Sequence, residues 1–232
     1  MNTPSFRAFA PRRRSAFTLV EVLIVIALIA MLLFLTVPGL KDVMKGTKLT
    51  TAADQIVADM NLARQTAIKE SVPVEVRFYK FFDPTQKEQR FGAYQAFKLA
   101  QDLNKPSEYT ADRIAKPLFE KVKTIPQGVV IVESEQWSPL LTDESMKGDD
   151  KRERVRGLIP GEMDTEAEYR SLIISPEGET SLERTGAKQW YITLVTEAEY
   201  RIAPDPTAIR PKNFIMLQVD PYTANTRRYQ PN

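Results

Sequence analysis

The sequence contains no cysteine and no histidine. Without cysteine, disulfide bonds, thiol nucleophiles and thiolate metal sites are excluded. Without histidine, the chain lacks the usual general base and the most common metal ligand. Carboxylates, hydroxyls and lysines remain, but no two acids are placed as a catalytic pair, and neither a Gly-x-Ser-x-Gly nor a Ser-x-x-Lys string occurs. We therefore expect a non-enzymatic protein with no catalytic residues, no cofactor and no metal.

Positive charge is concentrated at the beginning of the chain. Residues 1–16 contain no acid and four arginines, which are Arg7, Arg12, Arg13 and Arg14. The rest of the 232-residue chain carries 28 basic and 30 acidic residues, so its net charge is close to zero. Nucleic-acid phosphates require a basic face, which this body lacks. The sequence therefore predicts no nucleic-acid partner and a basic leader over residues 1–16.

A long apolar run follows the arginines, from Phe17 to Val37. Of its 21 residues, 15 are Leu, Ile, Val or Phe, and the only polar ones are Thr18, Glu21 and Thr36. As a helix it spans about 31 Å, the thickness of the hydrocarbon core of a bilayer. Arginines stay on the cytoplasmic side of a membrane span. We therefore expect a single pass through the inner (cytoplasmic) membrane, with the C-terminal part in the periplasm or outside.

Three common kinds of N-terminal segment could explain the apolar run: a secretory signal, a twin-arginine signal and a plain signal anchor. A secretory signal has a shorter apolar region that ends in a small-x-small site, whereas this run ends in Thr36-Val37-Pro38-Gly39-Leu40. Arg13-Arg14 resembles a twin-arginine signal, but the apolar region is too long. A plain signal anchor explains insertion and orientation, yet it does not require an acid one turn inside the run. Glu21 is such an acid, and an ionisable group in a membrane helix indicates function.

The segment from Arg14 to Glu21, RSAFTLVE, resembles the signature of type IV prepilins and type II secretion pseudopilins. The resemblance implies that a prepilin peptidase cuts between Ala16 and Phe17 and that Phe17 is then N-methylated. It also implies that Glu21 and Pro38 serve assembly with other pilin or pseudopilin subunits. The family has glycine before the cut, and Ala16 is the one departure.

The position of Glu21 also has a physical rationale. A carboxylate near a helix N-terminus is favoured by the helix dipole. A lone buried carboxylate is costly, but one paired with a cation is tolerated and can set register. Cleavage before Phe17 would create a cationic amine, which Glu21 of a neighbouring subunit can neutralise. Pro38, where many family members also have a proline, would loosen the helix in the filament.

Beyond Pro38 the apolar spacing remains helical over residues 38–70, and we expect this amphipathic helix to end near Glu70 because Pro73 follows. The period then changes to two, and Glu75, Arg77 and Lys80 predict one solvated face for the first strand. Strands are expected at Val72–Phe82, Phe91–Leu99, Leu118–Thr124, Val129–Glu133, Ser171–Ile174, Trp190–Val195, Phe214–Val219 and Thr226–Tyr229. The expected fold is α+β and resembles the pilin ladle. A long N-terminal helix, with a membrane-spanning half and an amphipathic half, packs on an antiparallel β-sheet head over residues 71–232.

Two further features belong to the head. The segment Thr142–Arg156 is highly charged and is expected to be an exposed insertion, and its acids match no calcium-loop template. The order Ile173–Gly178, Trp190–Val195 and Asn213–Tyr229 resembles the C-terminal sheet of H-class minor pseudopilins of type II secretion. The signature is also similar to that of prepilin-like cassette proteins from Verrucomicrobia-type bacteria.

Three functions stay open at this point. The first is a structural subunit, a minor pilin or pseudopilin that assembles through its N-terminal helix into a type IV pilus-like or type II secretion filament. The second is a membrane-anchored, exported binding module that does not polymerise, for which Glu21 would be incidental. The third is an anchored, exported enzyme that uses carboxylates. The acid inside the apolar run favours the first.

Overall fold

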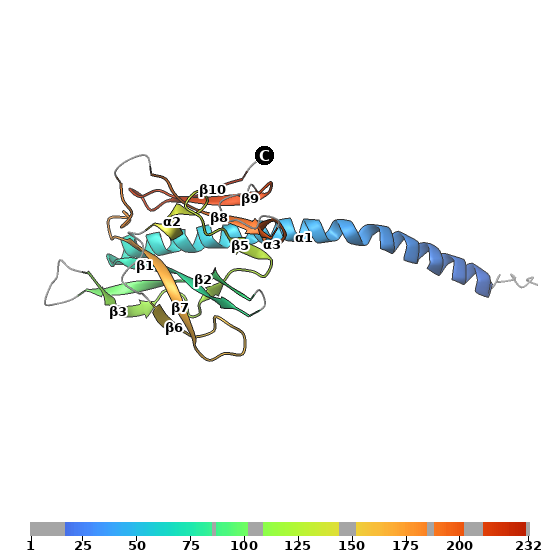
Figure 1. Ribbon diagram of the computed structural model, residues 1–232, viewed down its shortest axis with the longest axis horizontal. Helices are drawn as coiled ribbons and strands as arrows, with labels where there is room; N and C mark the ends of the chain where they lie inside the picture. Colours follow the sequence, from blue (N-terminus) through green and yellow to red (C-terminus); the bar gives the residue numbers. More distant parts are fainter. Residues whose placement is uncertain are drawn as a thin grey trace, which may run out of the picture. The chain divides into compact units, whose positions relative to one another are not determined.

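The computed structural model describes residues 17–84, 87–101, 109–143, 152–184, 188–201 and 211–230 (Figure 1). The backbone, but not the side chains, is described at 33–45, 100–101 and 109–116. The chain divides into two compact units, Met1–Val43 and Met44–Asn232. We call them the N-terminal unit and the C-terminal unit.

The first element is α1 (Leu19–Glu70), a helix of 52 residues that begins in the N-terminal unit and ends in the C-terminal unit. Its last residue is the one at which the sequence places the end. Ser71 follows with a φ of +53°, and the Val72 N–H donates to the Ala67 carbonyl at 3.2 Å. This is a Schellman arrangement, in which one residue in the left-handed conformation closes a helix.

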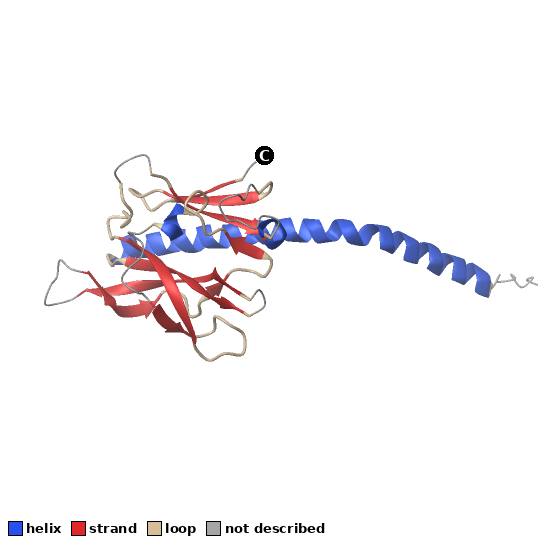
Figure 2. Cartoon of the chain, viewed as in Figure 1, coloured by secondary structure: helices blue, strands red, loops and turns tan. Residues whose placement is uncertain are grey.

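The described part of the C-terminal unit contains two antiparallel sheets (Figure 2). The six-stranded sheet has the order β3-β2-β1-β7-β6, with β4 paired to β2. Its strands are β1 (Val74–Asp83), β2 (Glu88–Gln101), β3 (Tyr109–Pro117), β4 (Lys123–Thr124), β6 (Arg152–Val155) and β7 (Thr165–Ile174). The four-stranded sheet has the order β10-β9-β8-β5. Its strands are β5 (Val129–Ile131), β8 (Trp190–Thr196), β9 (Phe214–Val219) and β10 (Thr226–Tyr229). Two short helices, α2 (Pro139–Thr142) and α3 (Glu197–Tyr200), contact β8.

The C-terminal part of α1 runs between the two sheets (Figure 1). Its buried side chains recur every three or four residues and are at most 2% exposed; they are Leu49, Ala52, Ala53, Ile56, Met60, Ala63 and Ala67. They share one hydrophobic cluster with β1 and β2 on one side and with β8 and β9 on the other. Alanines let the backbone of a helix come close to both sheets. The expected fold class, α+β with an N-terminal helix and antiparallel strands, is confirmed, but the helix packs on two sheets instead of one.

Polar contacts attach this part of α1 to both sheets. On one side, the Tyr94 hydroxyl of β2 donates to the Asp59 carboxylate at 2.7 Å. On the other, Arg228 of β10 donates to Asp54 at 2.6 Å. Burial and the hydrogen bond to Asp59 raise the pKa of Tyr94. Hydrogen bonds to β2 and β10 therefore hold the helix in place in addition to the packing of its apolar face.

The expectation of a solvated face on the first strand is wrong for two of its three residues. Glu75 is 0% exposed and Arg77 2% exposed. The reason is a second apolar cluster on this face of the six-stranded sheet, in which Val155 and Leu158 pack over aromatic residues of β1 and β2. The two charges are tolerated there because they pair with each other.

Several strand boundaries also differ from those expected. β6 lies inside Thr142–Arg156, where an exposed insertion was expected, because it pairs with β7 and buries Val155. Residues 144–151 of that segment lie outside the described residues. β3 was not expected at all, and β7 begins at Thr165 instead of Ser171. These stretches are rich in charge, and antiparallel pairing at or near a sheet edge tolerates charge on a solvated face.

Candidate functional site

Hydrogen bonds to Thr18 define where α1 begins in the N-terminal unit. The Thr18 hydroxyl oxygen accepts the Glu21 backbone N–H at 3.2 Å, and the Thr18 carbonyl accepts the Val22 N–H at 3.2 Å. The hydroxyl thus satisfies one of the donors that the first turn of a helix leaves unpaired. Thr18 is the N-cap, and Leu19 is the first helical residue.

Glu21 is the third residue of α1 and is exposed. The partial positive charge of the helix N-terminus favours a carboxylate at this position. Within the described residues, no cation lies at ion-pair distance from the Glu21 carboxylate, and no donor makes a hydrogen bond to it. Among the described residues, the Glu21 carboxylate is thus exposed and without an ion-pair partner.

The helix around Glu21 exposes an unusual amount of apolar surface. Twelve large apolar side chains are between 47% and 80% exposed; they are Phe17, Leu19, Val20, Val22, Leu23, Ile24, Val25, Ile26, Leu28, Ile29, Met31 and Leu32. The run Val22–Ile26 is unbroken, so with about 100° per residue it covers every side of the helix. A helix that is apolar all round has to be surrounded by lipid or by other apolar helices.

The residues expected from the sequence to form the site are placed as follows. Phe17 is exposed and lies immediately before the N-cap. Ala16, the other side of the expected cleavage site, lies outside the described residues. Pro38 is part of the helical backbone of α1, but its side chain is not described.

The expected membrane span, residues 17–37, is described with side chains as far as Leu32. In the portion of the chain for which the structure gives placements, no helix combines the length and apolar character needed to cross a membrane.

One residue of this site was missed by the sequence prediction. Thr18 was noted only as a polar residue in an apolar run, whereas the structure makes it the N-cap. The signal was present, because Thr18 and Glu21 form the Ser/Thr-x-x-Glu/Gln spacing of a capping box. Glu21 therefore occupies the third position of a helix whose start is fixed locally.

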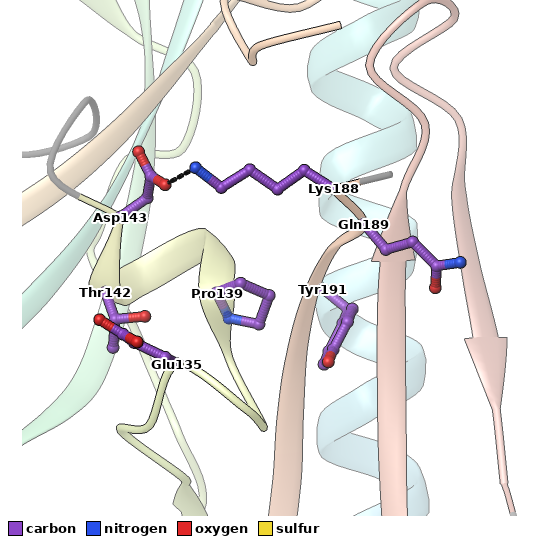
Figure 3. A pocket seen from close by; sticks show the side chains of 7 residues that line it. All are labelled: Glu135, Pro139, Thr142, Asp143, Lys188, Gln189 and Tyr191. Atoms are coloured by element: carbon purple, nitrogen blue, oxygen red, sulfur yellow. Dashed lines mark ion pairs between the residues drawn. The ribbon is translucent and has the colours of Figure 1, made fainter. Parts of the chain in front are cut away.

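A cavity of about 670 Å³ in the C-terminal unit is the first alternative site. It is lined by Glu135, Pro139, Thr142, Asp143, Lys188, Gln189 and Tyr191. Figure 3 shows the Lys188 ammonium directed at the Asp143 carboxylate, with which it forms an ion pair. The hydrogen bond to Asp143 raises the pKa of Lys188. A catalytic lysine needs a lowered pKa, so Lys188 does not resemble a catalytic lysine.

A buried ionic cluster on the six-stranded sheet is the second alternative. Arg77 donates to Glu75 at 2.6 Å and 2.9 Å and to Glu153 of β6 at 2.5 Å, and its guanidinium lies 4.8 Å and 4.6 Å from the ring centres of Phe97 and Tyr169. Burial alone would lower the pKa of Arg77, but the hydrogen bond and charges of its acidic partners raise it. The cluster connects β1 to β6 across β7, which is a structural role.

Throughout the stretches that the structure describes, no group of three or more carboxylates could hold a metal ion. The cations of these two sites, Arg77 and Lys188, are paired with acids, whereas the described part of the N-terminal unit exposes apolar side chains and one acid.

Comparison with known proteins gives one finding, and it falls on this unit. The sequence profile of the prokaryotic N-terminal methylation motif matches residues 11–37. No curated protein and no solved structure matches the chain. The motif is typical of type IV pilin-like precursors, which are exported, membrane-anchored structural subunits and not enzymes. Residues 11–37 of this chain are a prokaryotic N-terminal methylation motif, the type IV prepilin-like signal.

Proposed function

We propose that this chain is a non-enzymatic filament subunit, a minor pilin or pseudopilin, which polymerises through the N-terminal part of α1. A prepilin peptidase cuts between Ala16 and Phe17, and the new terminal amine of Phe17 is methylated. The mature protein keeps the apolar helix as its anchor in the inner membrane and as its assembly element. The head, residues 71–232, is exported to the periplasm or beyond in a pilin-like fold.

One observation carries this proposal: an acid lies one turn inside a helix that exposes apolar side chains on every side. In lipid alone, a carboxylate near the middle of a membrane helix costs about 2.5–3.5 kcal/mol, and less near its end. In a bundle of such helices, Glu21 can pair with the cationic amine of Phe17 from a neighbouring subunit. The pair compensates the charge and fixes the axial register between subunits.

Pro38 has a secondary role in this proposal. A proline inside a helix has no N–H for the carbonyl one turn earlier. Pro38 therefore weakens the helix between the apolar turns and the part held by the sheets, which allows α1 to adjust when it packs in a filament. The order of helix and strands in the head supports an H-class minor pseudopilin of type II secretion as the specific type.

The first experiment tests processing. The full chain is expressed with and without a prepilin peptidase, and the mature N-terminus is read by mass spectrometry. We expect a product that starts at N-methylated Phe17 only when the peptidase is present. An intact leader would instead support an anchored binding module that does not polymerise, and a cut after Val37, which removes the apolar run, would contradict an anchor of either kind.

The second experiment tests assembly. The chain has no cysteine, so single cysteines introduced at Ile26 and Met31 report contacts between subunits without background. We expect Glu21→Gln to reduce disulfide-linked oligomers at least tenfold in the presence of the peptidase, because the amide cannot neutralise an amine. Glu21→Asp, which keeps the charge, is the matched variant and should retain more crosslinking. Equal crosslinking in all three proteins would contradict the proposal.

A further inference from the structure

We infer that Thr18 is a positioning residue for leader cleavage: its hydroxyl stops the helix at Leu19 and thereby keeps the bond between Ala16 and Phe17 outside it. This inference rests on the proposed function, because it concerns the same cleavage. It assigns a role to a residue that the methylation-motif match does not explain.

The geometry at the helix start supports this role. Thr18 contributes both of the contacts that define the first turn, its hydroxyl oxygen to Glu21 N–H and its carbonyl to Val22 N–H, each at 3.2 Å. An N-cap residue has a non-helical backbone, and the residue before it lies outside the helix. Phe17, whose nitrogen belongs to the scissile bond, is that residue.

The composition before the scissile bond shows why a cap is needed. Residues 12–16 are Arg-Arg-Arg-Ser-Ala, without glycine or proline. Alanine and arginine are among the strongest helix formers, and Ala16 stands directly before the bond. The helix dipole disfavours arginines at the N-terminus, but this effect acts on the charges and does not fix a particular residue as the start. The hydroxyl of Thr18 fixes it.

Cleavage depends on where the helix starts. If α1 extended through residue 16, the Ala16 carbonyl would accept the Val20 N–H, and the scissile peptide would be inside a helical turn. Peptidases act on exposed, locally unfolded backbone. A helix that includes the bond must therefore unwind before it can be cut, and the Thr18 cap removes that step.

The test compares initial rates of leader cleavage for the full chain in membranes that contain a prepilin peptidase. We expect Thr18→Val, which keeps the shape but has no hydroxyl, to be cut on the order of fivefold more slowly, the factor that corresponds to the ~1 kcal/mol by which an N-cap favours its own helix start. Thr18→Ser keeps the cap and should be cut within about twofold of the original rate. Equal rates for the valine and serine variants would overturn the inference.

A compensating variant separates helix positioning from direct recognition of the hydroxyl. Glycine is the weakest helix former after proline, so in a chain that already carries Ala16→Gly the Thr18→Val change should slow cleavage by less than about twofold. The Ala16→Gly single variant is the reference rate for this comparison, because the family has glycine at this position and glycine alone is expected to speed cleavage. If the double variant stays slow, the peptidase reads the hydroxyl itself, and the inference is wrong. Amide hydrogen exchange in micelles gives a readout without the enzyme: Thr18→Val should slow exchange at Leu19 and Val20, as those amides gain helical partners.

Failure of the proposed function has a different signature. It would appear as an uncut parent chain, whatever residue stands at position 18. The inference about Thr18 would be overturned by unchanged exchange at Leu19 and Val20, or by slow cleavage of the double variant, in a protein that is otherwise processed.

Discussion

The two ends of α1 differ in the size and the exposure of their apolar side chains. Near the N-terminus, consecutive large side chains from Val22 to Ile26 are all exposed. In the C-terminal unit, the helix instead uses alanines such as Ala53 and Ala63, which are fully buried between two sheets. Large side chains offer apolar surface to surroundings that other molecules supply, whereas small ones admit the chain's own strands. The difference is that the chain's own strands cover the apolar side chains of one part of the helix, whereas those of the other part stay exposed.

The largest expected effect is the loss of stability when a buried isoleucine of α1 is truncated, and an exposed isoleucine of the same helix is the control. Ile56→Ala should lower the free energy of unfolding by about 2–5 kcal/mol, because Ile56 is 1% exposed and its removal leaves a cavity between the sheets. Ile26→Ala should leave it within about 0.5 kcal/mol, because Ile26 is 61% exposed. Both tryptophans lie in the C-terminal unit, so their fluorescence during denaturation of the full chain in micelles reports that unit. Similar losses of unfolding free energy for Ile56→Ala and Ile26→Ala would contradict the difference between the buried and the exposed part of α1.

The converse change enlarges alanines. Ala53→Leu should cost about 1–3 kcal/mol of unfolding free energy, since the added atoms have no space between α1 and the sheets. Ala27→Leu is the matched control on the exposed part of the same helix and should cost nothing measurable. Denaturant titration followed by tryptophan fluorescence measures both. A tolerant Ala53 would mean that the sheets do not close on the helix as described.

The smallest effect is a pH dependence confined to the C-terminal unit. The pKa of Tyr79 and of Tyr94 is raised, by burial first and then by hydrogen bonds to Glu153 and Asp59. Each tyrosine therefore contributes stability that is fully present below the unfolded pKa of about 10 and is lost as the pH rises beyond it. At pH 10.5 the loss is about 0.8 kcal/mol per tyrosine relative to pH 8.

The matching test measures unfolding free energy at pH 8 and 10.5 for Tyr94→Phe and for the exposed Tyr229→Phe. Tyr94→Phe should reduce the alkaline loss, and Tyr229→Phe should leave it unchanged. An alkaline loss that neither variant alters would show that another group dominates it.

Local sequence patterns predicted α1 and most strands, whereas the burial of charged residues and the pairing of the edge strand β6 depend on contacts between residues far apart in the sequence. The end of α1 near Glu70 and strands such as Phe214–Val219 could be predicted because periodicity is written in neighbouring residues. Glu75 and Arg77 were expected to be exposed to water. The segment that covers them contains Val155 and Leu158, and no residue close to β1 in the sequence indicates that it packs there. β6 was missed for the same reason: Glu153, far along the chain, is the partner of Arg77.

The site divides in the same way. The apolar run and the acid at Glu21 are local signals, and the profile match over residues 11–37 supports their reading. Thr18 was overlooked because a hydroxyl in an apolar run was interpreted as an exception instead of a cap. Ala16 and the side chain of Pro38 lie outside what the structure describes. The roles of all four expected site residues, Ala16, Phe17, Glu21 and Pro38, stay predictions.

The position of α1 between two sheets has a mechanical consequence. A tension applied along the axis of this part of the helix cannot open the C-terminal unit strand by strand from an edge. It must slide the helix lengthwise past both layers, so that the contacts of Ile56 and Met60 and the lateral bonds of Asp54 and Asp59 are sheared together. Such a geometry distributes force over many bonds at once, and we expect the unit to resist extraction by its helix better than an equally stable domain that is anchored at a single strand.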